Sequence, residues 1–139
     1  MTTPADTWSE IAELIDTAWQ DDVLTMSMPM LWDGVEGDAP TEGEPFARTS
    51  IRHDTGEKTT VGKGGRYRRD GSVIVQCFGR WGDGGREARK MAEVVASALD
   101  TGRTPSGAWF RNVGHQDAGR DGAYFQTNVT AAFTYQQMR

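Results

Sequence analysis

A glycine-rich turn, GRWGDGG at residues 79–85, is the first candidate for chemistry because it follows an apolar run and precedes a helical pattern. In a phosphate-binding G-x-x-x-x-G-K loop, backbone amides hold the phosphates while the lysine and the next hydroxyl hold charge and magnesium. No lysine occupies that position here, and GKGG at residues 62–65 has a glycine in place of the hydroxyl residue. The spacing also fails the dinucleotide fingerprint G-x-G-x-x-G. We therefore predict a structural connector, in which Asp83 accepts amide hydrogen bonds at the start of a helix.

The two histidines and the single cysteine are the candidates for acid–base or nucleophilic catalysis. We expect His53 at a strand end, His115 near a hairpin turn, and Cys77 inside an apolar strand as a small buried hydrophobe. An acidic segment lacks the calcium-loop pattern D-x-[DN]-x-[DN]-G and is predicted to be a solvated loop. Its carboxylates are Asp33, Glu36, Asp38, Glu42 and Glu44. We expect no catalytic residue, no metal and no cofactor, although a small enzyme stays open as an alternative class.

Two amphipathic helices would position these residues. The segment TWSEIAELIDTAWQ (7–20) repeats apolar residues on one face and places Thr7 three residues before Glu10, the spacing of a capping box. The segment REARKMAEVVASALDTG (86–102) has the same periodicity and ends at Gly102, where a C-terminal cap belongs.

Alternating and apolar runs predict four to five strands. A step at Asp70-Gly71, inside one of them, is typical of a bulge or a turn. The expected strands are Met30–Trp32, Phe46–His53, a strand centred on Val73–Phe78, and a hairpin of 106–116 and 123–137 joined by the turn DAGRDG (117–122). An acidic loop (33–45) and a flexible loop (54–65) separate the early strands.

These elements predict one α+β domain over residues 1–139, with a mostly antiparallel sheet of four to five strands and both helices packed on one face. The 139 residues suffice for one core but not for two. No apolar stretch is long enough to span a membrane, and the first residues lack a secretion signal, so we expect folding in a cytoplasm.

The net charge of −5 is unevenly distributed along the chain. Residues 1–57 contain 13 acidic and 2 basic residues, whereas residues 58–139 contain 7 acidic and 13 basic ones. The halves either neutralise each other within one fold or steer one copy onto another. A pI near 5.0 argues against nucleic-acid binding by the basic half, which stays as the less favoured alternative.

Taken in order, the chain resembles the tail terminator family of long-tailed bacteriophages. The segments that carry the resemblance are the leading amphipathic helix, PMLWDG, PFARTSIRHD with the Gly-rich loop after it, GSVIVQCFGRWGDGGREA running into a helix, and the ending NVTAAFTY. The acidic residues 33–44 have no counterpart in this pattern.

The resemblance implies a structural virion protein of the tail or neck. Such proteins form a ring, typically hexameric, that caps the tail tube, ends its polymerisation and meets the head-side connector. The implied partners are other copies of the chain, the major tail tube protein and a head-completion or stopper protein, while DNA passes through the lumen without sequence-specific binding. A neighbouring neck, minor tail or head-completion protein of related fold is the alternative.

Opposite charges in the two halves favour closure of a ring whose contacts join two different patches. We expect the loop 54–65 and its basic neighbours at subunit or tube contacts. The expected interface residues are Lys58, Lys63, Arg66, Arg68 and Arg69 on the basic side, and Asp33, Glu36 and Asp38 on the acidic side.

Overall fold

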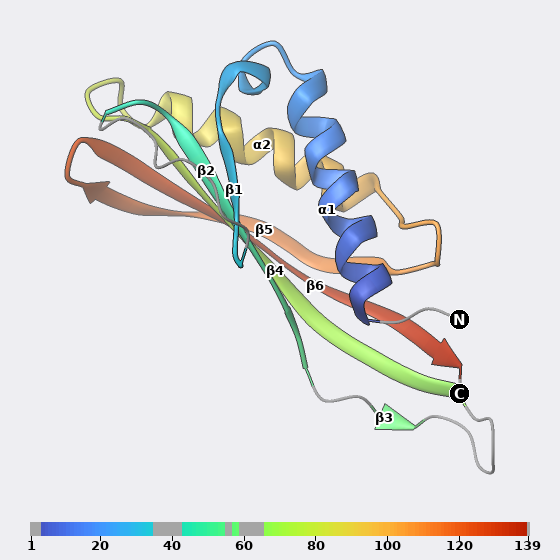
Figure 1. Cartoon of the computed structure of the whole chain (residues 1–139). Coiled ribbons are helices and arrows are strands. Elements are labelled where there is room, and N and C mark those ends of the chain that lie inside the picture. Colours follow the sequence, from blue (N-terminus) through green and yellow to red (C-terminus); the bar gives the residue numbers. More distant parts are fainter. Residues whose placement is uncertain (1–3, 35–42, 55–56, 59–65, 139) are drawn as a thin grey trace.

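The protein folds as one sheet with two helices on a single face, as seen in a computed structural model that describes residues 4–34, 43–54, 57–58 and 66–138 (Figure 1). The helices are α1 (Pro4–Asp21) and α2 (Arg86–Thr101), with a short 3-10 helix η1 (Thr25–Ser27) after α1. The strands are β1 (Met30–Trp32), β2 (Phe46–His53), β3 (Glu57–Lys58), β4 (Arg66–Arg80), β5 (Trp109–Asp121) and β6 (Tyr124–Met138).

The sheet has the order β1-β2-β4-β6-β5, and the two-residue β3 pairs beside β4. β1 is parallel to β2, and every other pairing is antiparallel. β4 and β6 pair continuously from Arg66↔Met138 to Arg80↔Tyr124, which makes them the long spine of the molecule. The predicted α+β class and the mostly antiparallel sheet are confirmed.

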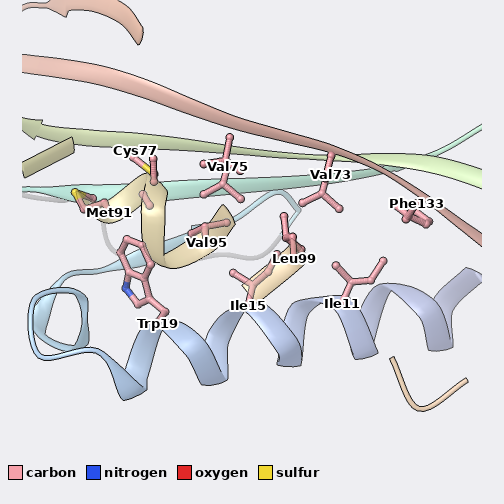
Figure 2. Close-up of a cluster of buried hydrophobic side chains, with 14 of the residues drawn as sticks. Ile11, Ile15, Trp19, Val73, Val75, Cys77, Met91, Val95, Leu99 and Phe133 are labelled. Carbon is pink, nitrogen blue, oxygen red and sulfur yellow. The ribbon is translucent and has the colours of Figure 1, made fainter. Parts of the chain in front are cut away.

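The core lies between the sheet and the helices (Figure 2). Strand side chains alternate between the two faces, so Val73, Val75 and Cys77 of β4 point toward the helices and are fully buried. Ile11, Ile15 and Trp19 of α1 belong to the same cluster, as do Met91, Val95 and Leu99 of α2. The Trp19 indole N–H donates to the Met28 carbonyl at 2.9 Å, which satisfies the one polar atom of that buried ring.

The predicted capping box at Thr7 is wrong. α1 already includes Pro4, so Thr7 lies inside the helix, where its side chain is fully buried beneath the first turns. Apolar periodicity found the helix, but its start is set upstream by a proline, a residue that fits the first helical turn.

Two strand details also differ from the prediction. Asp70 and Gly71 continue the β4–β6 register without a bulge, because Gly71 leaves room for the Phe133 ring. The predicted hairpin turn at 117–122 is wrong as well: β5 runs on to Asp121 through a register shift between Asp117 and Gly119, and β6 begins at Tyr124.

Gly102 is the C-terminal cap of α2, and its N–H donates to the Ala98 carbonyl at 2.9 Å. Its φ of −87° lies outside the left-handed region that such caps often use. A side chain there would instead collide with the Ala98 carbonyl and Leu14, so close packing explains the glycine.

Candidate interaction surface

The residues with catalytic potential lie apart from one another. Cys77 is fully buried, and burial raises the pKa of its thiol to about 12. His53 faces Phe133 and Tyr135 edge-on at 5.4 and 6.0 Å between ring centroids, and burial, followed by the charge of Arg69, lowers its pKa. His115 is exposed on β5. Within the described residues, no group of three His, Cys, Asp or Glu side chains is placed to hold a metal.

The glycine-rich turn is a connector, as predicted. Asp83 accepts hydrogen bonds from the Gly85 N–H at 2.9 Å and the Glu87 N–H at 3.0 Å. Gly85 caps α2 with φ 81°, a left-handed conformation that favours glycine. A side chain at Gly85 would also collide with the Phe125 ring, so the turn is packed against β6.

The predicted interface residues fall in different parts of the fold. Lys63, Glu36 and Asp38 lie outside the described residues, and Lys58 and Arg66 are placed by their backbone alone, in β3 and at the start of β4. Asp33 follows β1 and accepts a hydrogen bond from the Ser50 hydroxyl at 2.5 Å.

Arg68 and Arg69 are consecutive in β4, so their side chains leave opposite faces of the sheet. Ser50, the partner of Asp33, pairs with Ile74. Arg68 is six residues from Ile74, or about 20 Å along the strand at ~3.3 Å per residue. Within one copy, the acidic Asp33 and the basic Arg68 therefore do not meet.

Arg68 instead belongs to a polar cluster on the helix-free face of the sheet. Its Nε lies 3.3 Å from Asp70 Oδ1, and the same oxygen accepts from the Thr134 hydroxyl at 2.7 Å. Arg111 of β5 donates to the Thr134 hydroxyl and lies 3.7 Å from Asp70 Oδ1. The Thr134 hydrogen bond, and then the arginines, lower the pKa of Asp70. The cluster joins β4, β6 and β5 and leaves a cationic surface.

A second cluster, which sequence reasoning missed, lies where the β4–α2 turn meets the β5–β6 hairpin. Trp81 is 49% exposed, yet its backbone N–H donates to the Ala123 carbonyl at 3.0 Å and its ring stacks on Phe125 with the centroids 6.2 Å apart. The Arg120 guanidinium lies 4.6 Å from the Trp81 ring centroid. In the sequence, the only signal for this surface was the basic and aromatic composition around Trp81. Its contacts could not be predicted, because they join residues that are far apart in sequence.

Arg89 of α2 holds this second cluster to the sheet. It makes a two-pronged contact with Asp117 of β5, at 2.7 and 3.1 Å to Oδ2, and lies 5.2 Å from the Phe125 centroid. The hydrogen bond between Arg89 and Asp117 lowers the pKa of Asp117 and raises that of Arg89.

Of the hollows that lie beside the helices, two differ clearly in size and lining. The larger, about 1020 Å³, is open and lies between the end of α1 and α2, where Asp21, Val23, Glu87 and Lys90 contribute to its walls. The smaller, about 310 Å³, lies between α1 and β1 and is lined by Trp8, Ala12, Glu13, Asp16 and Trp32. The larger hollow is lined by carboxylates, by Lys90 and by the serines Ser27 and Ser97, whereas the smaller has aromatic walls and an acidic rim. No helix in the described part of the chain has the length and apolar character needed to cross a membrane.

A family model described as "Phage tail terminator protein" matches residues 10–133. That match covers α2, all of α1 except its first six residues, and all the strands except the end of β6. No curated protein matches the sequence.

Solved structures share the fold at low sequence identity. One, a protein without a functional name, has a TM-score of 0.71 at 16% identity, with 99% of this chain and 98% of that chain covered. Another is a chain of the virion of a native gene transfer agent particle, with a TM-score of 0.57 at 13% identity and 93% of each chain covered. At these identities, the likeness establishes the fold.

Proposed function

Because the chain belongs to the phage tail terminator family and is a structural component of the virion tail, we propose that it closes a ring over the end of the finished tail tube. The ring stops the tube from growing and forms the joint to the head-side connector. The observation that carries the proposal is the family match over residues 10–133. The role requires shape and contact surfaces and no chemical reaction.

Ring formation is supported by the difference between the two sides of the sheet. One edge is the three-residue β1 with α1 above it, and the other is the long β5. Contacts between unlike surfaces, repeated by rotation, close into a ring, whereas a contact between like surfaces stops at a dimer. We propose a homo-oligomeric ring, a hexamer by analogy with the family.

The helix-free face of the sheet suits the lumen. Its central positions include Ser50, Ser72, Gln76, Gln126, Asn128 and Thr130, and arginines flank them, which are Arg48 and Arg52 of β2 and Arg68 and Arg111 of the polar cluster. Arginines on such a face would contact DNA phosphates, which carry no base sequence, so a duplex could pass it without base-specific contacts. DNA therefore passes through the lumen without sequence-specific binding.

The β3 end of the molecule is proposed as the contact with the tube or with a neighbouring copy. It carries Lys58, Arg66, Arg68 and Arg69, and Lys63, which lies outside the described residues, is proposed to act with them. The acidic partners would be Asp33, Glu36 and Asp38 of another molecule. Reversing two charges, in Arg68→Glu/Arg69→Glu, should reduce retention on purified tube ends, measured by co-sedimentation. The matched pair Lys90→Glu/Arg103→Glu changes the net charge equally on exposed parts of the helix layer and should leave retention unchanged. Equal retention by both pairs would remove these residues from the interface.

The function itself is tested by electron microscopy of particles made without this protein. We expect tails of abnormal and variable length that are not joined to heads, and normal particles when the gene is supplied in trans. Tails of normal length with unjoined heads would instead indicate a neighbouring neck or head-completion protein. Normal, joined particles would refute the proposal.

A further inference from the structure

We propose that the exposed Trp81, together with Arg120, inserts into the hollow between α1 and β1 of the next copy, and that this contact links neighbouring subunits around the ring. The inference rests on the proposed ring function and adds the pair of surfaces that builds it. The occupant of the hollow is thus a second copy of this chain.

The Trp81 side is a preorganised projection. Its backbone hydrogen bond to Ala123, its stacking on Phe125 and the guanidinium of Arg120 hold the ring in one orientation, although half of it is exposed. A rigid aromatic residue loses little conformational entropy on binding. Tryptophan and arginine are also the residues most enriched among those that dominate protein interfaces.

The receiving side is a hollow with aromatic walls and an acidic rim. Trp8 and Trp32 meet edge to face with their centroids 6.1 Å apart, and both stay partly exposed. Ala12 keeps the hollow open between them, while Glu13 and Asp16 are exposed at its rim. Its volume of about 310 Å³ can receive one large aromatic side chain.

The charges of the two sides are complementary. α1 contains five acidic residues and no lysine or arginine, so its exposed side is uniformly negative. Arg120 would approach this surface beside Trp81, and at short range an opposite charge contributes both orientation and affinity. The hollow is therefore suited to an aromatic ring accompanied by a cation.

The two surfaces also lie at different places on the subunit, as a ring requires. The hollow belongs to α1 and β1, at one edge of the sheet order, and Trp81 stacks on β6 beside the β5–β6 hairpin, next to the opposite edge. Figure 1 shows the β4–α2 and β5–β6 turns together on the left and α1 on the right. One copy therefore presents both halves of the contact to two different neighbours, which is a head-to-tail arrangement.

Disulfide trapping tests the geometry, because the only native thiol, Cys77, is fully buried and should not react. The variant Ala12→Cys/Ala123→Cys keeps Trp81, Arg120 and both tryptophans of the hollow, and it places one small thiol in the hollow and one beside Trp81. After mild oxidation on tube ends, we expect a ladder of covalent oligomers with a fixed largest member, the ring. The control Ser97→Cys/Ala123→Cys, with its first thiol on α2, should stay mostly monomeric.

A charge exchange tests the chemistry. Arg120→Asp or Asp16→Arg alone should lower the yield of trapped oligomers by about tenfold or more, and the two together should restore most of it. Arg103→Asp, an equal charge change at an exposed position after α2, should leave the yield unchanged.

Several results would overturn this contact. They are the absence of cross-links on tube ends, cross-links to the tube protein alone, a ladder that stops at a dimer, or no restoration by the exchanged pair. The outcome is separate from that of the proposed function, because particles without the protein can show long, unjoined tails even if subunits meet through other surfaces.

Discussion

At the scale of single residues, Gly71 is among the most constrained positions in the sheet. A Cβ there would lie 2.3 Å from both the Arg52 carbonyl oxygen and Cζ of the buried Phe133 ring. The backbone of β2 and a fully buried ring have little freedom to move away. We expect Gly71→Ala to lower the free energy of unfolding by about 1–3 kcal/mol, the usual cost of overpacking, as measured by urea denaturation.

Gly114 provides the matched control. It lies in β5, where an added Cβ would meet nothing within 4 Å. Gly114→Ala should be neutral or stabilise the fold by up to ~1 kcal/mol, because alanine restricts the unfolded chain. Equal denaturation midpoints for the two variants would show that the space around Gly71 is not limiting.

His53 gives the fold a dependence on pH. Burial is the main reason that its pKa lies below the usual 6.5; Arg69 adds to this, and Asp54 opposes it. The folded protein therefore binds this proton less readily than the unfolded chain does. The contribution of neutral His53 is fully present above pH 6.5 and declines as the pH falls through 6.5 toward the folded pKa.

The variant His53→Gln should therefore show a smaller loss of stability than the wild type between about pH 7.5 and 5.5, followed by chemical denaturation at each pH. His115→Gln, an exposed replacement on β5, serves as the control and should follow the wild type. Asp70 and Asp117 have lowered pKa values, so their contributions are lost only in more acidic solution. Parallel curves for the wild type and His53→Gln would contradict this assignment.

At the scale of elements, the start of α2 depends on Asp83. Its two carboxylate oxygens accept the N–H groups of Gly85 and Glu87, which lack partners inside the helix. Asp83→Ala should cost about 1 kcal/mol, in the range measured for other helix caps. Asp83→Asn keeps one acceptor oxygen and should cost less, and urea denaturation of both variants checks the order. If Asp83→Ala had the same stability as the wild type, water would be replacing these hydrogen bonds without cost.

The sequence predicted elements better than their ends. A repeat of apolar residues with helical spacing is strong enough to identify α1 and α2, since it records which face is buried. The β5–β6 turn was misplaced because a register shift between Asp117 and Gly119 lets β5 continue past a glycine that is typical of turns. The ends of such strands are decided by how they pair with their neighbours. The residue pattern of a single strand does not contain that information.

At the scale of the whole molecule, the candidate surfaces were the least predictable part. Thr134 reaches Asp70 across 64 positions of sequence, and Arg120 meets Trp81 only after the hairpin folds back. The charge of each residue is evident in the sequence, but its face of the sheet depends on register. Arg68 and Arg69 were therefore predicted together and point to opposite sides.

The single core predicts that the molecule unfolds as one unit. Ile15 of α1 is fully buried in the same cluster as residues of β4, α2 and β6, so α1 cannot leave without exposing the rest. Ile15→Ala should cost about 2–5 kcal/mol, and helical circular dichroism and tryptophan fluorescence should still report one shared transition. Val23→Ala, at a position that is 87% exposed, should stay within about 0.5 kcal/mol of the wild type. If the helical signal of Ile15→Ala were lost before the fluorescence change, α1 would be a separate unit, and the acidic surface proposed to bind Trp81 would not be rigidly held.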